Sequence, residues 1–342
     1  MTVQATIFGI EGTVLSANER DFFQDSAPFG FILFKRNCVS PEQVRALTDQ
    51  LRDCLGRPLP VLIDQEGGRV QRLAPPIWPA RPAPRQFGEL YAQNPAAGCR
   101  AAHLNALLMA AELADLGINV NCVPDLDLGH ADGHPAVIGD RVYGDDPAVV
   151  TALGRAVADG MMAGGVLPVI KHLPGHGRAH LDTHFDLPRI EASLADLEKT
   201  DFLPFRALAD LPMAMTGHLV MAAIDDRQPA TTSAKLIAET IRAWMGFNGL
   251  LMSDDLSMQA LTGDLTKRAA DSLAAGCDIA LHCNGDMPEM LAVAAGAVQL
   301  EGAAEKRAMR VIDDLAQVAT VSCDLVAADA ELTDLMAMRD AS

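Results

Sequence analysis

The sequence predicts an α/β protein built as a single (β/α)8 barrel, and two observations support this fold class. Eight short apolar runs rich in β-branched residues recur along the 342 residues, and helical patterns separate most of them. The alternative is an open doubly wound sheet, but neither glycine-rich phosphate-binding motif of such sheets occurs at a strand–helix junction. The predicted strands are Ala5–Ile10, Gly30–Phe34, Pro60–Ile63, Ile118–Val123, Val166–Ile170, Met213–Thr216, Gly249–Met252 and Asp278–Leu281.

Two of the intervening helices have clear ends. Ser40, which precedes a proline, is a favourable N-cap, and Gln43 stands at the capping-box position. Asp146 also precedes a proline and begins a second helix, which Gly164 could end. The first helix repeats apolar residues on one face, at Val44, Leu47, Leu51 and Leu55.

A third helix is expected to begin at Thr232 or Ser233 and to end at Gly246. No low-complexity linker, charge block or internal repeat divides the chain, so we expect residues 1–342 to form a single domain. The last twenty or so residues are expected to form a peripheral helix or a loose tail.

Charge and cysteine content argue against several classes of protein. Acidic residues outnumber basic residues 45 to 27, and the net charge of −18 disfavours nucleic acids and membranes as partners. No uncharged apolar run approaches the ~18 residues of a membrane-spanning helix, and no signal peptide is evident. The seven cysteines lack the spacing of a zinc site or a disulfide framework. We therefore expect a soluble cytoplasmic protein with reduced thiols.

Polar side chains follow all eight predicted strands. The C-terminal ends of barrel strands carry the chemistry in this fold, so these residues are expected to meet at one end of the barrel. A purely structural role is the alternative for any single member, because loops are generally polar. The residues are Glu11, Lys35-Arg36-Asn37, Asp64, Asp125 with Asp127, Lys171-His172, His218, Asp254-Asp255, and His282 with Asn284.

The segment 171–188, KHLPGHGRAHLDTHFDLP, holds four histidines spaced four residues apart. On a helix this spacing would align metal ligands, but its proline and glycines oppose a helix. A metal-dependent hydrolase would then rely on H-x-D-x-H at 180–184, and the end of the first strand offers it no histidine. The other interpretation is an Asp182–His184 dyad for proton transfer, with Asp254 as a nucleophile.

Three long motifs resemble one enzyme family. They are DQEGGRVQRL at 64–73, KHLPGHG at 171–177 followed by Asp182-Thr183-His184, and SDDLSM at 253–258. In sequence and order they are similar to the β-N-acetylhexosaminidases of glycoside hydrolase family 3, of the short bacterial type that recycles peptidoglycan. The resemblance runs from about residue 5 to about residue 300. It implies the barrel fold and an active site without a metal or cofactor.

The resemblance also implies a role for each matching position. Asp254, and not Asp255, corresponds to the nucleophile; His184 corresponds to the general acid/base, and Asp182 to the residue that orients it. Five further positions match residues that hold the terminal sugar: Asp64, Arg72, Arg141, Lys171 and His172. Charge-assisted hydrogen bonds to sugar oxygens suit these side chains.

Two charged residues in the first motif are expected to be structural. Glu66 and Arg69 flank two glycines that suggest a tight turn, and an internal salt bridge is the expected role.

The implied reaction removes terminal β-linked N-acetylglucosamine from GlcNAc-1,6-anhydro-MurNAc, with or without peptide. Asp254 would form a covalent glycosyl-enzyme and His184 would transfer the protons, with retention of configuration. A histidine in the acid/base role departs from the usual pair of carboxylates. Because neutral imidazole repels an anion less than a carboxylate does, phosphate could replace water as acceptor.

Three rival hypotheses remain beside this one. Asp254 and Asp255 could support substrate-assisted catalysis by the sugar's acetamido group, without an enzyme–sugar bond. The barrel could also be a non-catalytic sugar-binding module, although such a module needs no Asp–His pair. The metal-dependent hydrolase is the third. We expect a small-molecule substrate and a monomer, since no added domain indicates an oligomer.

Overall fold

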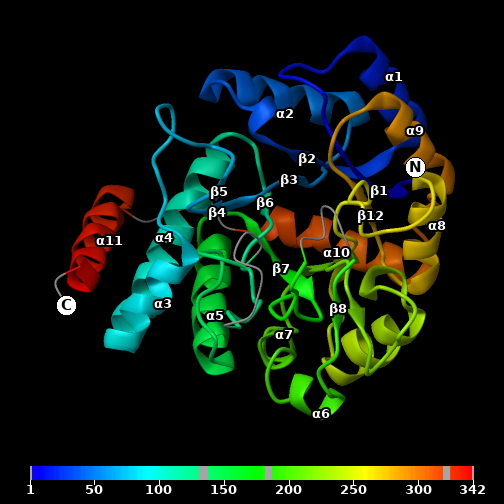
Figure 1. The fold of residues 1–342 in the computed structure, drawn as a ribbon. Helices are drawn as coiled ribbons and strands as arrows, with labels where there is room; N and C mark the ends of the chain where they lie inside the picture. The colour runs from blue at the N-terminus through cyan, green and yellow to red at the C-terminus, as the bar shows by residue number, and fades with distance from the viewer. Residues whose placement is uncertain (1, 131–137, 182–186, 319–323, 341–342) are drawn as a thin grey trace.

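A computed structural model describes residues 2–130, 138–181, 187–318 and 324–340 of the chain (Figure 1). Its main sheet has eight strands in the order β11-β9-β7-β6-β3-β2-β1-β12, and every hydrogen-bonded pair is parallel. The strands are β1 (Gln4–Gly9), β2 (Pro28–Leu33), β3 (Val61–Ile63), β6 (Val120–Asn121), β7 (Leu167–Leu173), β9 (Met213–Thr216), β11 (Leu250–Met252) and β12 (Ala280–His282).

The first and last strands in this order, β11 and β12, meet and nearly close the barrel. Met252 forms a parallel bridge with Ile279, and the Ser253 amide donates to the Ile279 carbonyl over 3.0 Å. All eight predicted strands are present, and each lies within or overlaps its predicted run. The predicted (β/α)8 barrel is therefore confirmed.

Alternating side chains of the strands fill two separate apolar layers. Ile7 and Leu62 belong to the cluster inside the barrel, whereas Phe8 and Val61 pack outward against the helices. Burial on both faces explains why the strands read as continuous apolar runs. Helix α10 (Gly302–Gln317) adds two residues to the inner cluster, Ala308 and Val311, and so covers the N-terminal end of the barrel.

Helices surround the barrel in the order expected of βα units (Figure 1). The α-helices are α1 (Ala17–Ser26), α2 (Pro41–Leu55), α3 (Pro84–Gln93), α4 (Pro95–Asp115), α5 (Pro147–Ala163), α6 (Leu194–Leu197), α7 (Leu203–Ala207), α8 (Leu265–Ala275), α9 (Met287–Gly296), α10 and α11 (Leu325–Asp340). Two short 3-10 helices, η1 (Lys35–Asn37) and η2 (Ala230–Thr232), lie in loops. No helix among the described residues is both long and apolar enough to cross a membrane.

The expected helix ends are mostly confirmed. Asp146 caps α5 and Gly164 ends it, as the sequence indicates. Ser40 caps α2 by accepting from the Gln43 amide over 3.2 Å, but the Gln43 side chain accepts from Val39 instead of Ser40. The predicted capping box is therefore only half formed.

The third expected helix differs in type. Residues Leu236–Trp244 form the π-helix η3, in which the Ser233 hydroxyl accepts from the Leu236 amide over 3.1 Å. Gly246 follows with a φ of 76°, which explains why a glycine ends the helix. Ile237 and Ile241 are buried, so the apolar face predicted the helix but not its wider turn.

Helix α11 packs against α3 and α4 at the edge of the molecule, away from the barrel (Figure 1). The Arg100 guanidinium forms two hydrogen bonds of 2.7 Å with the Glu331 carboxylate, which joins α4 to α11. The end of the chain thus contains a peripheral helix.

Candidate active site

Lys171 lies at the centre of the polar residues that gather at the C-terminal end of the barrel. The residue belongs to β7, and its side chain is 2% exposed. Its ammonium nitrogen lies 2.9 Å from Asp64 Oδ1 and 2.7 Å from Glu66 Oε1. Each partner follows or lies in a different strand, because Asp64 follows β3 and Glu66 lies in the small strand β4 (Gln65–Gly67). The barrel therefore brings together the charged groups that the sequence places at strand ends.

Asp64 is held between two cations. The second is Arg72, whose Nη2 atom lies 3.1 Å from Asp64 Oδ2. Burial acts to raise the pKa of Asp64, but attraction to Lys171 and Arg72 outweighs it and lowers the pKa well below its usual value. The Arg72 guanidinium also lies over the Phe34 ring, 5.2 Å from the ring centroid. Asp64 is therefore a fixed, ionised acceptor, as expected of a residue that binds sugar hydroxyls.

Glu66 has different partners from those that the sequence suggested. Arg141 binds it with two parallel hydrogen bonds, of 2.8 Å from Nε and 2.7 Å from Nη2. Arg69 pairs instead with Asp140 over 2.9 Å. The expected salt bridge between Glu66 and Arg69 is therefore wrong. Burial would raise the pKa of Glu66, but Arg141 and Lys171 lower it to about 2.

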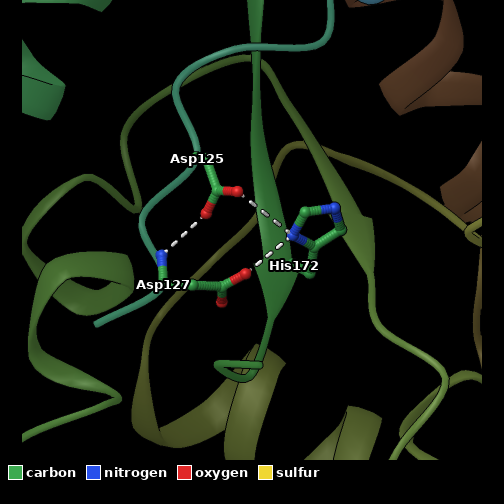
Figure 2. A group of neighbouring side chains, drawn as sticks. All are labelled: Asp125, Asp127 and His172. Atoms are coloured by element: carbon green, nitrogen blue, oxygen red, sulfur yellow. Dashed lines mark hydrogen bonds and ion pairs between the residues drawn. The ribbon is translucent and has the colours of Figure 1, made fainter. Parts of the chain in front are cut away.

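The structure adds Asp125 and Asp127 to the group of candidate site residues (Figure 2). His172 Nδ1 lies 2.8 Å from Asp127 Oδ2 and 3.8 Å from Asp125 Oδ2. The Asp127 amide donates to Asp125 Oδ1 over 3.0 Å, so the two carboxylates face the same ring. Sequence reasoning noted these aspartates only as strand-end residues and assigned them no role. A D-x-D pattern directly after a buried strand was the available signal.

Burial governs the protonation of this cluster. It raises the pKa of Asp125 to about 7, to which repulsion from Asp127 contributes. It likewise raises the pKa of Asp127 to about 6. Burial lowers the pKa of His172, so the imidazole favours its neutral form. The two aspartates therefore titrate near neutral pH, whereas the His172 ring stays neutral there.

One ligand atom from each of Asp125, Asp127 and His172 falls within 4.8 Å of the others, which could accommodate a cation. However, Arg141 Nη2 lies 3.5 Å from Asp125 Oδ2 and already supplies positive charge there. Of the H-x-D-x-H feature, Asp182 and His184 lie outside the described residues. The described histidines of this segment, at 172, 176 and 180, do not share a helix, as expected from the proline and glycines between them.

Asp254 follows β11 at the same end of the barrel. Its Oδ1 accepts from the Asp255 amide over 2.8 Å. Burial raises the pKa of Asp254, but His218, His172 and this amide lower it below its usual value. Asp254 is therefore a carboxylate that stays ionised, as a nucleophile must.

Asp255 is engaged elsewhere, in agreement with the choice of Asp254 as the candidate nucleophile. Its Oδ1 accepts from the amides of Ser257 and Cys283, both over 3.1 Å. The Asp255 carbonyl also lies 2.9 Å from His218 Nε2. These contacts hold the loop after β11, so Asp255 has a structural role.

Comparison with known proteins shows the family of this chain. Residues 12–320 match the model of the glycosyl hydrolase family 3 N-terminal domain. A β-hexosaminidase of Alkalilimnicola ehrlichii is 42% identical over 288 residues, covering 83% of this chain and 82% of the relative. A β-hexosaminidase of Xylella fastidiosa M23 is 40% identical over 296 residues, covering 85% and 86%.

Solved structures agree in fold. Native NagZ from Neisseria gonorrhoeae superposes with a TM-score of 0.87 at 30% identity, over 98% of both chains. A family 3 β-N-acetylglucosaminidase from Paenibacillus superposes with a TM-score of 0.85 at 27% identity, and this chain spans 66% of its length. The chain therefore belongs to glycosyl hydrolase family 3 and is an enzyme of its β-N-acetylhexosaminidase group.

Proposed function

We propose that this enzyme is a retaining exo-β-N-acetylglucosaminidase of cytoplasmic cell-wall recycling. Its substrate is GlcNAc-1,6-anhydro-MurNAc, with or without peptide. The observation that carries the proposal is the half-buried, ionised Asp254 at the end of the barrel that also holds Asp64 and Lys171. A relative of the same fold supports it, because NagZ from Neisseria gonorrhoeae has been crystallised with N-trifluoroacetyl-D-glucosamine.

Asp254 attacks the anomeric carbon of the terminal N-acetylglucosamine in the first step. The new carbon–oxygen bond replaces the glycosidic bond, and His184 donates its proton to the departing sugar oxygen. Asp182 holds the His184 ring in the tautomer that this transfer needs. In the second step, His184 takes a proton from water, which attacks the anomeric carbon and releases Asp254. Two inversions at one carbon retain its configuration.

The five sugar-holding residues form two linked ion-pair groups. Arg72 and Lys171 fix both oxygens of Asp64, which keeps lone pairs free to accept from sugar hydroxyls. Arg141 and His172 lie next to Glu66 and Asp127. The Arg141 guanidinium can donate to a sugar oxygen, and the free ring nitrogen of His172 can accept from a sugar hydroxyl. Because these groups are paired before substrate binds, little reorganisation is needed on binding.

The first experiment measures release of nitrophenol from its β-N-acetylglucosaminide, in EDTA, by wild type, Asp254→Ala and His184→Ala. Activity in the chelator that collapses in both variants supports the proposal, and activity lost in the chelator contradicts it. A wild type that is inert in buffer and in added phosphate would favour a sugar-binding barrel.

Two further measurements test the finer statements. Proton NMR of the first-formed product gives its anomeric configuration, and the β-anomer is expected. A fluorinated sugar should trap a glycosyl-enzyme on Asp254, whereas substrate-assisted catalysis would leave no enzyme–sugar bond. Comparing kcat/KM for GlcNAc-1,6-anhydro-MurNAc with that for a chitin disaccharide tests the substrate, and equal values would contradict the assignment. The same assay in phosphate detects glycosyl phosphate if phosphate is the acceptor.

A further inference from the structure

We propose that Asp127 is a positioning residue with two roles. It fixes the orientation of the His172 ring, and it holds residues 176–178, the loop base, which precede His184 in the sequence. The proposal rests on the role of His184 proposed above. Asp127 is 2% exposed and lies two residues after Asp125, where it faces His172 at the end of β7.

The first contact of Asp127 orients an imidazole. Asp127 Oδ2 lies 2.8 Å from His172 Nδ1, and Figure 2 shows the second ring nitrogen turned away from both aspartates. A carboxylate acceptor at Nδ1 keeps the proton on that nitrogen, so Nε2 presents a lone pair. Asp125 does not share this role, because its nearest oxygen is 3.8 Å from Nδ1.

The second contact of Asp127 holds the backbone. Its Oδ1 accepts from the His176 amide over 2.6 Å. One carboxylate therefore links His172, in β7, to His176, on the far side of the Pro174-Gly175 turn. Both carboxylate oxygens of Asp127 therefore have a hydrogen-bond partner.

Neighbouring contacts show that the loop base is held tightly at this point. A Cβ atom on Gly177 would lie 2.1 Å from the Leu128 carbonyl oxygen, so the loop runs directly against the backbone that follows Asp127. Next along the chain, Arg178 Nε donates to Asp201 Oδ2 over 2.8 Å. Asp127 and Asp201 thus anchor residues 176 and 178, which precede His184 in the sequence.

An amide in place of Asp127 cannot satisfy both contacts in the same way. Its oxygen can accept from the His176 amide only if its NH2 group faces His172 Nδ1. The ring must then accept at Nδ1 and carry its proton on Nε2, which reverses the hydrogen bond offered to the substrate. Turning the amide over would instead direct its NH2 group at the His176 N–H, so that both groups are donors.

The experiment compares kcat/KM for two substrates, phenyl and 2,4-dinitrophenyl β-N-acetylglucosaminide. Phenol is a poor leaving group that needs a proton from the enzyme, whereas dinitrophenolate leaves without one. The variants are Asp127→Asn, His184→Ala and Asp278→Asn. Asp278 is a matched control, since it is a buried aspartate that accepts from the Leu251 amide and two arginines at the other end of the barrel.

Asp127→Asn is expected to lower kcat/KM about 100-fold for the phenyl substrate and less than about 10-fold for the dinitrophenyl substrate. His184→Ala should show the same selective loss, and Asp278→Asn should lose stability without any dependence on the leaving group. Equal losses of Asp127→Asn on both substrates, or no loss, would overturn the proposal for Asp127. If His184→Ala itself shows no selective loss, the proposed function fails instead.

Discussion

Lys171 and Glu66 form an ion pair that is almost completely removed from solvent. The two charged atoms are 2.7 Å apart, and the side chains are 2% and 1% exposed. A buried charge is tolerated only when its partner is present. Since Lys171 also binds Asp64, and Glu66 also binds Arg141, this pair joins the two groups of residues proposed to hold the sugar.

Glu66→Gln is expected to destabilise the enzyme by about 3 kcal/mol, because it removes the buried negative charge that Lys171 and Arg141 share. Lys171 then retains only Asp64, and Arg141 only Asp125, as a nearby carboxylate. Urea unfolding measures the effect. Arg69→Gln is the control, because the pair of Arg69 with Asp140 is more than a third exposed and contributes little. Similar losses in both variants would show that burial of the Glu66 pair has no special importance.

Asp254→Asn should lower kcat/KM about 10⁴-fold while the fold is kept, because the amide cannot attack the anomeric carbon. Asp255→Asn should lose stability by about 1–2 kcal/mol through its contacts with Ser257 and Cys283, and should lose far less activity. Steady-state kinetics and circular dichroism of both variants measure this. The reverse order of activities would assign the nucleophile to Asp255.

The raised pKa of Asp125 predicts that the stability of the enzyme depends on pH. Burial raises the pKa of Asp125 to about 7, so the folded state binds a proton that the unfolded state releases near pH 4. A raised pKa on an acid reduces stability as pH rises from about 4 to about 7. Asp125→Asn removes this loss, so its stability relative to wild type should be higher at pH 8 than at pH 5. Unfolding in urea at the two pH values gives the difference, and an unchanged difference would contradict the raised pKa.

Gly177→Ala should disrupt the loop base. The added methyl group would meet the Leu128 carbonyl oxygen at 2.1 Å, so the backbone must move and displace the segment that follows. We expect a loss of kcat/KM of about 10-fold or more and a lower melting temperature. Gly12→Ala is the control, because nothing lies within 4 Å of its added carbon. If both variants behave like wild type, the loop base tolerates displacement.

The sequence by itself predicted the barrel and the end of it that carries the chemistry. Strands buried on both faces need continuous apolar residues, so each run from Ala5–Ile10 to Asp278–Leu281 was visible without an alignment. The polar residues after these runs had to meet, because parallel strands direct their C-terminal ends to one side. Asp64 and Lys171 illustrate this, since both were named from strand ends and lie 2.9 Å apart.

Only the tertiary structure decided which of these residues pair. Glu66 and Arg69 are close in sequence, yet Glu66 pairs with Arg141 and Lys171 in the barrel mouth, whereas Arg69 pairs with Asp140. Spacing along the chain likewise assigns no partner to Asp127, which in the folded protein contacts His172 and the His176 amide. A hydrogen bond between distant segments needs a donor–acceptor distance correct to a few tenths of an ångström and a suitable angle. The spacing of residues along the chain does not determine where a side chain points to that precision.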